Sequence, residues 1–435
     1  MEVLESLIGA VRRCCAAFPD QRTGTNVRYA MPDIGMGAFS LFFVQSPSFL
    51  DFQRRLEAGH GRSNCQTLFG MSRIPTDNHI RAMLDPVAPD HLFPVFDEVV
   101  AALERSGGLA AFRRACGVPA AWLARADRAR RHRVPSLHQD PLPELLEVHP
   151  RRPADRALPH DGVRHHRGPG PCPGRAARAR VHPAAGRARK AGLREPRVRR
   201  WLARHGARYA RLDPIYLGDD LLACQPVCEA VLAEGGHFLF TCKPSSHQTI
   251  QEYLTGIELD EHVERLRRGR THATHTYRWL CDVPLRAGKD ALTVNWLSIE
   301  IRDAKGKLTY RNSFITDLPV TRETVAELAA CARARWKIEN ESFNVLKNGG
   351  YHLEHNFGHG QQHLASLLVC FNLLAFAIHT VADLAKGAWR HARETLGPRT
   401  RFFNNLQGLT TYLVFASWTE LLETLACVRA PPRPP

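Results

Sequence analysis

Apolar residues recur three and four positions apart through much of the first 115 residues of the chain. This spacing places one face of a segment in a core and predicts helices separated by short loops. We predict helices over Val3–Ala17, over Ser63–Met71, from Thr76 or Asp77 to Leu84, and over His91–Ser106. Residues 1–115 are therefore expected to form a helical domain, which either recognises DNA or has another role.

From about Trp201 onward, the pattern changes to short apolar strands that alternate with helices. A strand over Ile215–Leu217, a helix from Pro226 to Gly235 and a strand over Phe238–Cys242 predict a βαβ-like unit. β-Branched and aromatic residues then predict a hairpin, and a long helix follows it. The hairpin strands are Thr293–Ile301 and Leu308–Ile315, and the helix runs from Val325 to Lys347 before Asn348–Gly349–Gly350.

The longest apolar stretch, from Leu364 to Ile378, has about 15 residues, fewer than the roughly 18 that a membrane-spanning helix needs. It contains Ser366 and Asn372, and we predict a helix buried in the core. The N-terminal residues lack the basic start of a signal peptide. Twelve cysteines at irregular spacing do not suggest a disulfide framework, so we expect a reducing, cytoplasmic location and no membrane.

Positive charge is concentrated in one segment of the chain. The formal net charge is +16 with a pI near 9.7, and residues 124–200 supply +13 of it through 19 Arg and one Lys against seven Asp and Glu. A strongly basic balance indicates a polyanionic partner such as nucleic acid. The same 77 residues contain 11 Pro and no Phe, Trp, Tyr, Ile, Met, Asn or Thr, so they cannot bury a core and should be disordered.

Three interpretations of this Arg/Pro-rich segment compete. It is a basic arm that binds nucleic acid, a flexible linker between domains, or the product of a frame error in a GC-rich gene. We favour the frame error, because codons built only of G and C encode Gly, Ala, Pro and Arg. A frame moved one nucleotide downstream allows Asp-Gly-Thr-Glu-Tyr at Arg130–Pro135, Cys-Pro-Asn-Cys at Leu142–Leu146, and Thr-Glu-His-Tyr-His-Thr-Met-Val at Asp155–Gly162.

Three residues in the second half of the chain indicate chemistry on DNA. Asp219 directly follows a predicted strand, where the carboxylates of an open α/β sheet face the functional crevice. Arg335 and Glu339 lie four positions apart on the predicted long helix and so share a face. Taken singly, they would be a turn cap and a surface ion pair. Together, an Asp at a strand end and an Arg and Glu on a later helix are what metal-assisted phosphoryl transfer requires.

In these residues the chain resembles DDE-type transposases of bacterial insertion sequences, in the group with a Y-x2-R-x3-E-x6-K signature. Arg335, Glu339 and Lys347 match its R, E and K, and the resemblance covers roughly residues 201–385. It implies an α/β fold with an RNase H-like catalytic core, a β-rich insertion, and Mg²⁺ or Mn²⁺ held by three carboxylates. Asp219 would be the second of these and Glu339 the third, while Arg335 and Lys347 would contact DNA.

The resemblance also implies double-stranded DNA at transposon ends as the partner, and it allows a homodimer in that complex. The chain departs from the family pattern at three points. Ala332 replaces the Tyr of the signature, and seven residues rather than six separate Glu339 from Lys347. The first Asp is missing, because Arg130 and Arg131 stand where the shifted frame would place Asp-Gly.

Without the first carboxylate, a pair of metal ions is poorly held. We therefore expect a catalytically impaired transposase. The alternatives are a non-catalytic protein that occupies transposon ends and an RNase H-like nuclease. Two further metal candidates are the pair Cys224 and Cys228 and the group His352, His355, His359 and His363.

Six segments follow from this interpretation. They are a helical N-terminal domain (1–115), the Arg/Pro-rich segment (116–200), the first part of the core (201–245), the β-rich insertion (246–320), the second part of the core (321–385) and a helical tail (386–435). Because both would bind the same metal ions, we expect Asp219 and Glu339 to lie close together.

Overall fold

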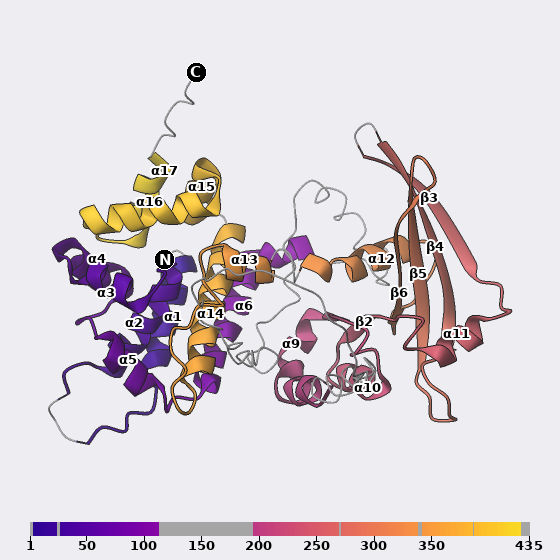
Figure 1. Ribbon diagram of the computed structural model, residues 1–435, viewed down its shortest axis with the longest axis horizontal. Coiled ribbons are helices and arrows are strands. Elements are labelled where there is room, and N and C mark those ends of the chain that lie inside the picture. The colour runs from indigo at the N-terminus through magenta and orange to yellow at the C-terminus, as the bar shows by residue number, and fades with distance from the viewer. Residues whose placement is uncertain are drawn as a thin grey trace, which may run out of the picture.

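The computed structural model describes residues 3–23, 27–112, 195–268, 271–337, 342–385 and 387–427. Figure 1 shows two parts, a helical body and an α/β body built on one six-stranded sheet. The mixed α/β class and the helical N-terminus predicted from the sequence are confirmed. Most of the Arg/Pro-rich segment lies outside the described residues. Its last residues, 195–200, are helical and Val198 packs in a core, so ordered structure begins before Trp201.

The helical body combines both ends of the described chain. Its elements are α1 (Val3–Ala16), α2 (Met31–Phe43), α3 (Phe49–Glu57), α4 (Gly59–Phe69), α5 (Asp77–Leu84), η1 (Pro89–Leu92), α6 (Phe93–Arg105), η2 (Gly108–Phe112), α13 (Asn344–Asn348), α14 (Leu364–Leu384), α15 (Ala388–Leu396), α16 (Arg399–Tyr412) and α17 (Trp418–Cys427). One hydrophobic core runs through them from Leu4 to Leu425. Helices that the sequence division assigns to three separate segments therefore pack together.

Helix α14 lies in the middle of this core, where it packs against α1, α2 and α6. Thirteen of its 21 residues are buried, and it extends beyond the predicted Ile378 because Val381 and Ala382 continue the buried surface. By length and composition alone it could cross a membrane, but 67% of its apolar window is buried inside the protein. Its surroundings are those of a core helix, as the sequence predicts.

The N-terminus of α14 is closed by a carboxylate from a distant part of the chain. Asp85, which follows α5, accepts hydrogen bonds from the backbone N–H groups of Gln361 (2.9 Å), Gln362 (3.0 Å) and Leu364 (3.2 Å). Partial burial opposes the charge, but the backbone donors outweigh it and lower the pKa of Asp85. Gly360 has a φ of 63°, and a Cβ there would overlap the carboxylate, so this position needs glycine.

We predict that Asp85→Ala lowers the free energy of unfolding by about 2 kcal/mol, the upper end of helix-cap losses, because several N–H groups lose one acceptor. Asp85→Asn should lose less, since its amide oxygen still accepts. The advantage of the wild type should be present above the pKa of an unfolded Asp, near 3.8, and disappear as the pH falls through the lowered folded value. Urea unfolding between pH 7 and pH 2 measures it. Equal stability of Asp85→Ala and wild type at pH 7 would contradict the cap.

The α/β body follows the chain from residue 202 to residue 333. Its elements are η4 (Leu202–Gly206), α9 (Ala207–Tyr209), η5 (Ala210–Leu212), β1 (Ile215–Gly218), α10 (Gln225–Ala233), β2 (His237–Thr241), α11 (Gln248–Leu254), β3 (Asp260–Arg268), β4 (Thr271–Pro284), β5 (Thr293–Asp303), β6 (Leu308–Thr316) and α12 (Val325–Arg333). The strand order is β1-β2-β6-β5-β4-β3. β1 and β2 are parallel, and all other pairs are antiparallel.

The predicted βαβ unit and the hairpin of β5 and β6 are confirmed. The sequence does not predict β3 and β4 as strands. Seven of the nine residues of β3 are charged or His, which hides the strand pattern, and only its pairing with β4 along nine positions makes it part of the sheet. Both strands belong to the β-rich insertion.

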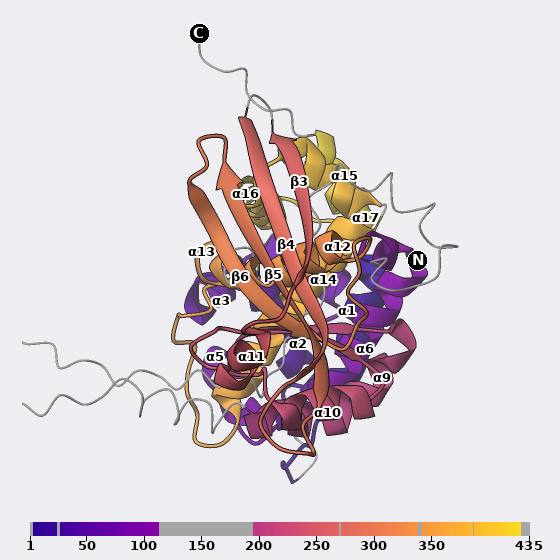
Figure 2. The ribbon, with the colours of Figure 1, turned by 90° about the vertical axis from the view of Figure 1, so that its right-hand side faces the viewer.

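The two faces of the sheet are covered differently. Tyr277, Leu297, Ile299 and Phe314 lie on one face and pack against α12. On the other face, residues near the start of β5, such as Trp296, pack with α10 and α11. Beyond Trp296 that second face is polar, and no helix of the described chain covers it, as Figure 2 shows.

Ion pairs join the two bodies along α6. Each of three arginines near the start of the α/β body meets an acidic residue of the helical body: Arg204 with Asp90 (2.6 Å), Arg208 with Asp97 (2.7 Å), and Arg211 with Glu104. All six side chains are at least one third exposed, so each pair alone stabilises the contact weakly.

Candidate active site

Asp219 lies directly after β1, as the sequence predicts. Because β1 and β2 are parallel, Gly218 and Thr241 end at the same edge of the sheet, which we call the carboxyl edge. The side chain of Asp219 is partly buried, and its Oδ1 accepts a hydrogen bond from the backbone N–H of Leu221 at 3.1 Å. This short turn holds the carboxylate at the carboxyl edge.

Asp220 ties the end of β1 to the loop after β2. Its carboxylate accepts hydrogen bonds from the backbone N–H of Lys243 (2.6 Å) and the hydroxyl of Ser246 (2.6 Å), and Nε2 of His247 lies 3.4 Å from Oδ1. Burial disfavours the charge, but His247, Ser246 and the Lys243 N–H outweigh it and lower the pKa of Asp220. Asp220 therefore has a structural role, separate from that expected of Asp219.

The helix predicted over Val325–Lys347 is not continuous, because a turn at residues 334 and 335 interrupts it. α12 ends at Arg333, because the backbone N–H groups of Ala334 and Arg335 bond three residues back, to the carbonyls of Cys331 and Ala332, and tighten the last turn. Arg335 lies in the turn that follows. Residues 336 and 337 are helical again, and because Glu339 lies outside the described residues, a shared face for Arg335 and Glu339 stays a prediction.

α12 runs along the sheet toward the side on which the carboxyl edge lies. α12 begins after Val320, at the opposite end of the sheet, since β6 runs antiparallel to β2. At its other end the guanidinium of Arg333 lies 4.7 Å from the ring centroid of Tyr310. Tyr310 precedes Phe314, the residue paired with Thr241 at the carboxyl end of β2. α12 thus runs from the amino end of β2 toward the side of the sheet at which β2 ends.

Glu339 lies outside the described residues, so its approach to Asp219 stays a prediction. Lys347 belongs to α13, whose Leu346 packs in the core of the helical body. The Nζ of Lys347 forms an ion pair with Glu354 at 2.6 Å. Arg335 therefore follows α12, which packs on the sheet, whereas Lys347 lies within α13, which packs on the helical body.

No group of three or more His, Cys, Asp or Glu side chains in the described part of the chain could hold a metal ion. Burial raises the pKa of both Cys224 and Cys228, which disfavours the thiolates that a metal binds. The ring of His355 packs against Phe357 instead. Neither of the two further candidates gathers a set of metal ligands here.

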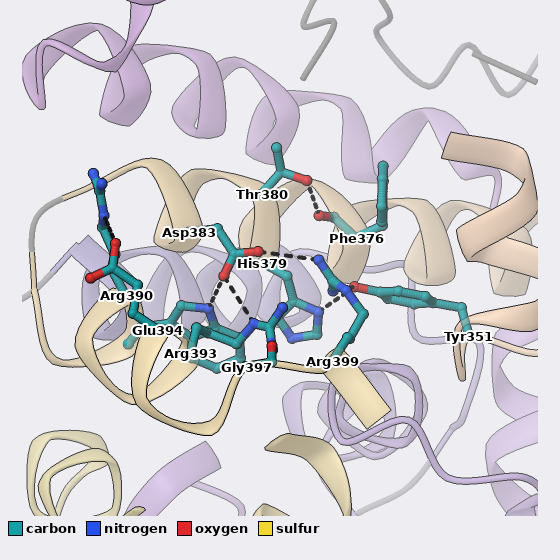
Figure 3. Close-up of polar contacts among 11 residues, drawn as sticks. Tyr351, Phe376, His379, Thr380, Asp383, Arg390, Arg393, Glu394, Gly397 and Arg399 are labelled. Atoms are coloured by element: carbon teal, nitrogen blue, oxygen red, sulfur yellow. Dashed lines mark hydrogen bonds and ion pairs between the residues drawn. The ribbon is translucent and has the colours of Figure 1, made fainter. Parts of the chain in front are cut away.

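A buried polar network that the sequence did not reveal joins α14, α15 and α16 (Figure 3). Tyr351 and His379 are buried, and the Tyr351 hydroxyl donates a hydrogen bond to Nδ1 of His379 at 2.6 Å. Arg399 donates to the Tyr351 oxygen (2.8 Å) and to Oδ2 of Asp383 (3.1 Å). Tyr351 follows α13 by three residues, so the network anchors the segment after Lys347 to the helical body.

Burial sets the protonation state of this network. It lowers the pKa of His379 well below the usual value, and the positive charges of Arg399 and Arg393 lower it further, so the imidazole is neutral. Burial also raises the pKa of Tyr351 to about 12, which keeps its hydroxyl protonated as the hydrogen-bond donor. The sequence holds no local signal for this network, because its members lie up to 48 positions apart.

Comparison of the chain with protein-family models and with curated proteins finds no match. The functional assignment therefore depends on the geometry of the carboxyl edge and on the motifs in the sequence.

The two adjacent aspartates can be separated by experiment. We predict that Asp220→Ala lowers the free energy of unfolding by roughly 2–3 kcal/mol, because three donors lose a charged acceptor that is only 12% exposed. The matched variant Asp219→Ala should lose less, because Asp220 and not Asp219 accepts the hydrogen bonds from Lys243 and Ser246 that join the end of β1 to the loop after β2. Chemical denaturation of both variants measures the difference. Equal losses of stability in the two variants would contradict the assignment of the structural role to Asp220 alone.

Proposed function

We propose that the chain is the transposase of a bacterial insertion sequence, with impaired catalysis. Enzymes of this type cleave and join DNA strands in a metal-dependent reaction. The observation that carries the proposal is that Asp219 follows β1 at the carboxyl edge, and that α12, which precedes Arg335, runs toward the same side of the sheet. The substrate would be double-stranded DNA at transposon ends, in the cytoplasm.

The order of the elements supports this proposal. Strands β3 to β6 are inserted between β2 and α12, and β6 extends the sheet from β2. The resemblance to DDE-type transposases implies such a β-rich insertion between the second Asp and the Glu. A βαβ unit, an antiparallel insertion and a returning helix occur here in that order.

The position of β1 in the sheet supports a missing strand. In the described sheet β1 is an edge strand that pairs with β2 alone, so its other side can pair with a further strand. A strand added at this edge would run beside Asp219. The shifted frame at Arg130–Pro135 would supply a strand with Asp-Gly-Thr, and its carboxylate would be the first of the proposed triad.

The described residues do not fit a two-metal site. Of the three expected carboxylates, they supply Asp219 only, and no group of three ligands forms among them. We therefore assign no catalytic step to a metal ion in the chain as it stands. Arg335 would bind a DNA phosphate, for which a guanidinium is suited by charge and shape.

A second candidate follows from the missing carboxylate. A chain that retains DNA contacts but lacks the first Asp would occupy transposon ends without cutting them. Inverted repeats on both sides of the gene are expected for either candidate. Cleavage by a frame-corrected protein separates them.

We predict that restoring the shifted frame between about Val118 and Arg200 produces Mg²⁺- or Mn²⁺-dependent cleavage of a duplex that contains the element's end. The chain as given should cut that duplex at least about a hundredfold more slowly, because metal-assisted attack supplies much of the rate. Asp219→Ala in the corrected protein should abolish cleavage and is the control. Equal cleavage by the given and corrected chains would mean that the missing carboxylate was never needed.

A further inference from the structure

The polar half of the sheet's second face, which we call the open face, is defined by the strand register. Residues that pair directly across strands share a face, and the pairs Glu261–Arg278, Arg278–Ser298 and Ser298–Ser313 fix this one. Its members are Glu261, Val263, Arg265, Arg267, His272, Thr274, Thr276, Arg278, Ser298, Glu300, Arg302, Leu308, Arg311 and Ser313. In Figure 2 this face is turned toward the viewer, and α11 lies near the lower ends of the strands.

The open face is basic although the chain around it is not. It contains five Arg against two Glu, a local charge of +3. The arginines lie on all four strands of the insertion, across about 14 Å at the usual strand spacing of about 4.8 Å. A positive surface of this width is complementary to a polyanion.

Two carboxylates hold some of these guanidinium groups in place. Glu300 pairs with Arg311 (3.2 Å) and Arg302 (3.5 Å), and Glu261 pairs with Arg278 (2.7 Å). The arginines remain 42–69% exposed, whereas Glu300 is 16% exposed and is covered by its partners. An ordered guanidinium loses less conformational entropy when it binds a phosphate.

The other side chains of the open face distinguish between classes of partner. Thr274, Thr276 and Ser298 can donate hydrogen bonds to phosphate oxygens, as hydroxyls do in protein–DNA complexes. Tyr277 and Trp279 lie on the opposite face under α12, and Trp296 is buried against α10 and α11, so bases have no stacking platform here. The aliphatic members, Val263 and Leu308, lie at the margins, on the edge strand β3 and at the first residue of β6, so the open face lacks the apolar centre of a stable protein interface.

We propose that the open face binds the sugar–phosphate backbone of double-stranded DNA. The inference rests on the proposed function, and it names the surface on which the duplex lies. β6 continues past Phe314, the partner of Thr241, toward Leu308, so the open face extends outward from the carboxyl edge. A duplex on it would lead to Asp219, and its backbone would be bound without regard to sequence.

Binding of a short duplex by the full chain, in EDTA to prevent cleavage, tests the proposal. The variants are Arg265→Gln with Arg267→Gln, and separately Thr274→Glu, which adds a carboxylate between Arg265 and Arg302. The matched controls on the helical body are Arg54→Gln with Arg62→Gln and Thr67→Glu, all at exposed positions. The Arg/Pro-rich segment is the same in every protein, so it contributes equally to each.

We expect the double Arg variant to bind on the order of tenfold more weakly, and the slope of log affinity against log salt to fall by about 2, one per lost phosphate contact. Thr274→Glu should also weaken binding, while both controls keep the wild-type slope. Unchanged thermal unfolding midpoints show that the variants fold. Equal slopes for the face variants and the controls overturn the proposal while leaving the proposed function intact. The proposal is also overturned, with the proposed function left intact, if the face variants weaken the binding of single-stranded DNA but not of the duplex. A wild-type chain that does not bind duplex DNA contradicts both.

Discussion

The burial of α14 is the constraint on which the helical body depends. An α-helix leaves backbone groups at both ends without partners in the helix, so this core helix of 21 residues is held at its ends by other segments. Asp85 supplies the acceptor at the N-terminus. Near the C-terminus, Asp383 accepts from Arg399 and from the indole N–H of Trp389. These partners come from both sides of the Arg/Pro-rich segment, which explains why the ends of the described chain form one body.

The sheet depends on a different arrangement, in which a short parallel pair carries a long antiparallel extension. β1 has four residues and a single partner in the described sheet, whereas β4 has 14 residues and two partners. Asp220 compensates by bonding the end of β1 to the loop after β2. A strand pair that needs such a side-chain tie at its end is consistent with the proposed loss of a neighbouring strand.

The sequence predicts elements whose pattern is local. Helices with one buried face, such as α1 and α6, and the aromatic hairpin of β5 and β6 were found in this way. α2 was missed because 12 of its 13 residues are buried, so no polar face reveals the helical period. Its Gly35 also resembles a loop signal, but a Cβ there would overlap Cys15, and glycine instead lets α1 and α2 approach closely.

The candidate site shows the same limit. Asp219 could be predicted because a carboxylate after an apolar strand is a local signal. The partners of Asp220 could not, because Lys243 and Ser246 lie 23 and 26 positions away. The end of α12 at Arg333 was also missed. The sequence from Val325 to Lys347 contains no Gly or Pro, so nothing in its composition marks the turn.

Net charge alone is poor support for DNA binding by this chain. Residues 124–200 supply +13 of the total of +16, and most of them lie outside the described structure. The remainder is close to neutral, so any polyanion site in it must come from the separation of charge. The strand register achieves this, because alternate residues of β3 point to opposite faces. Arg265 and Arg267 therefore fall on the open face, while His262 and Glu264 fall on the other. The proposed DNA binding by the folded part would thus be a property of one surface, and it would persist if the frame were corrected and the Arg-rich sequence lost.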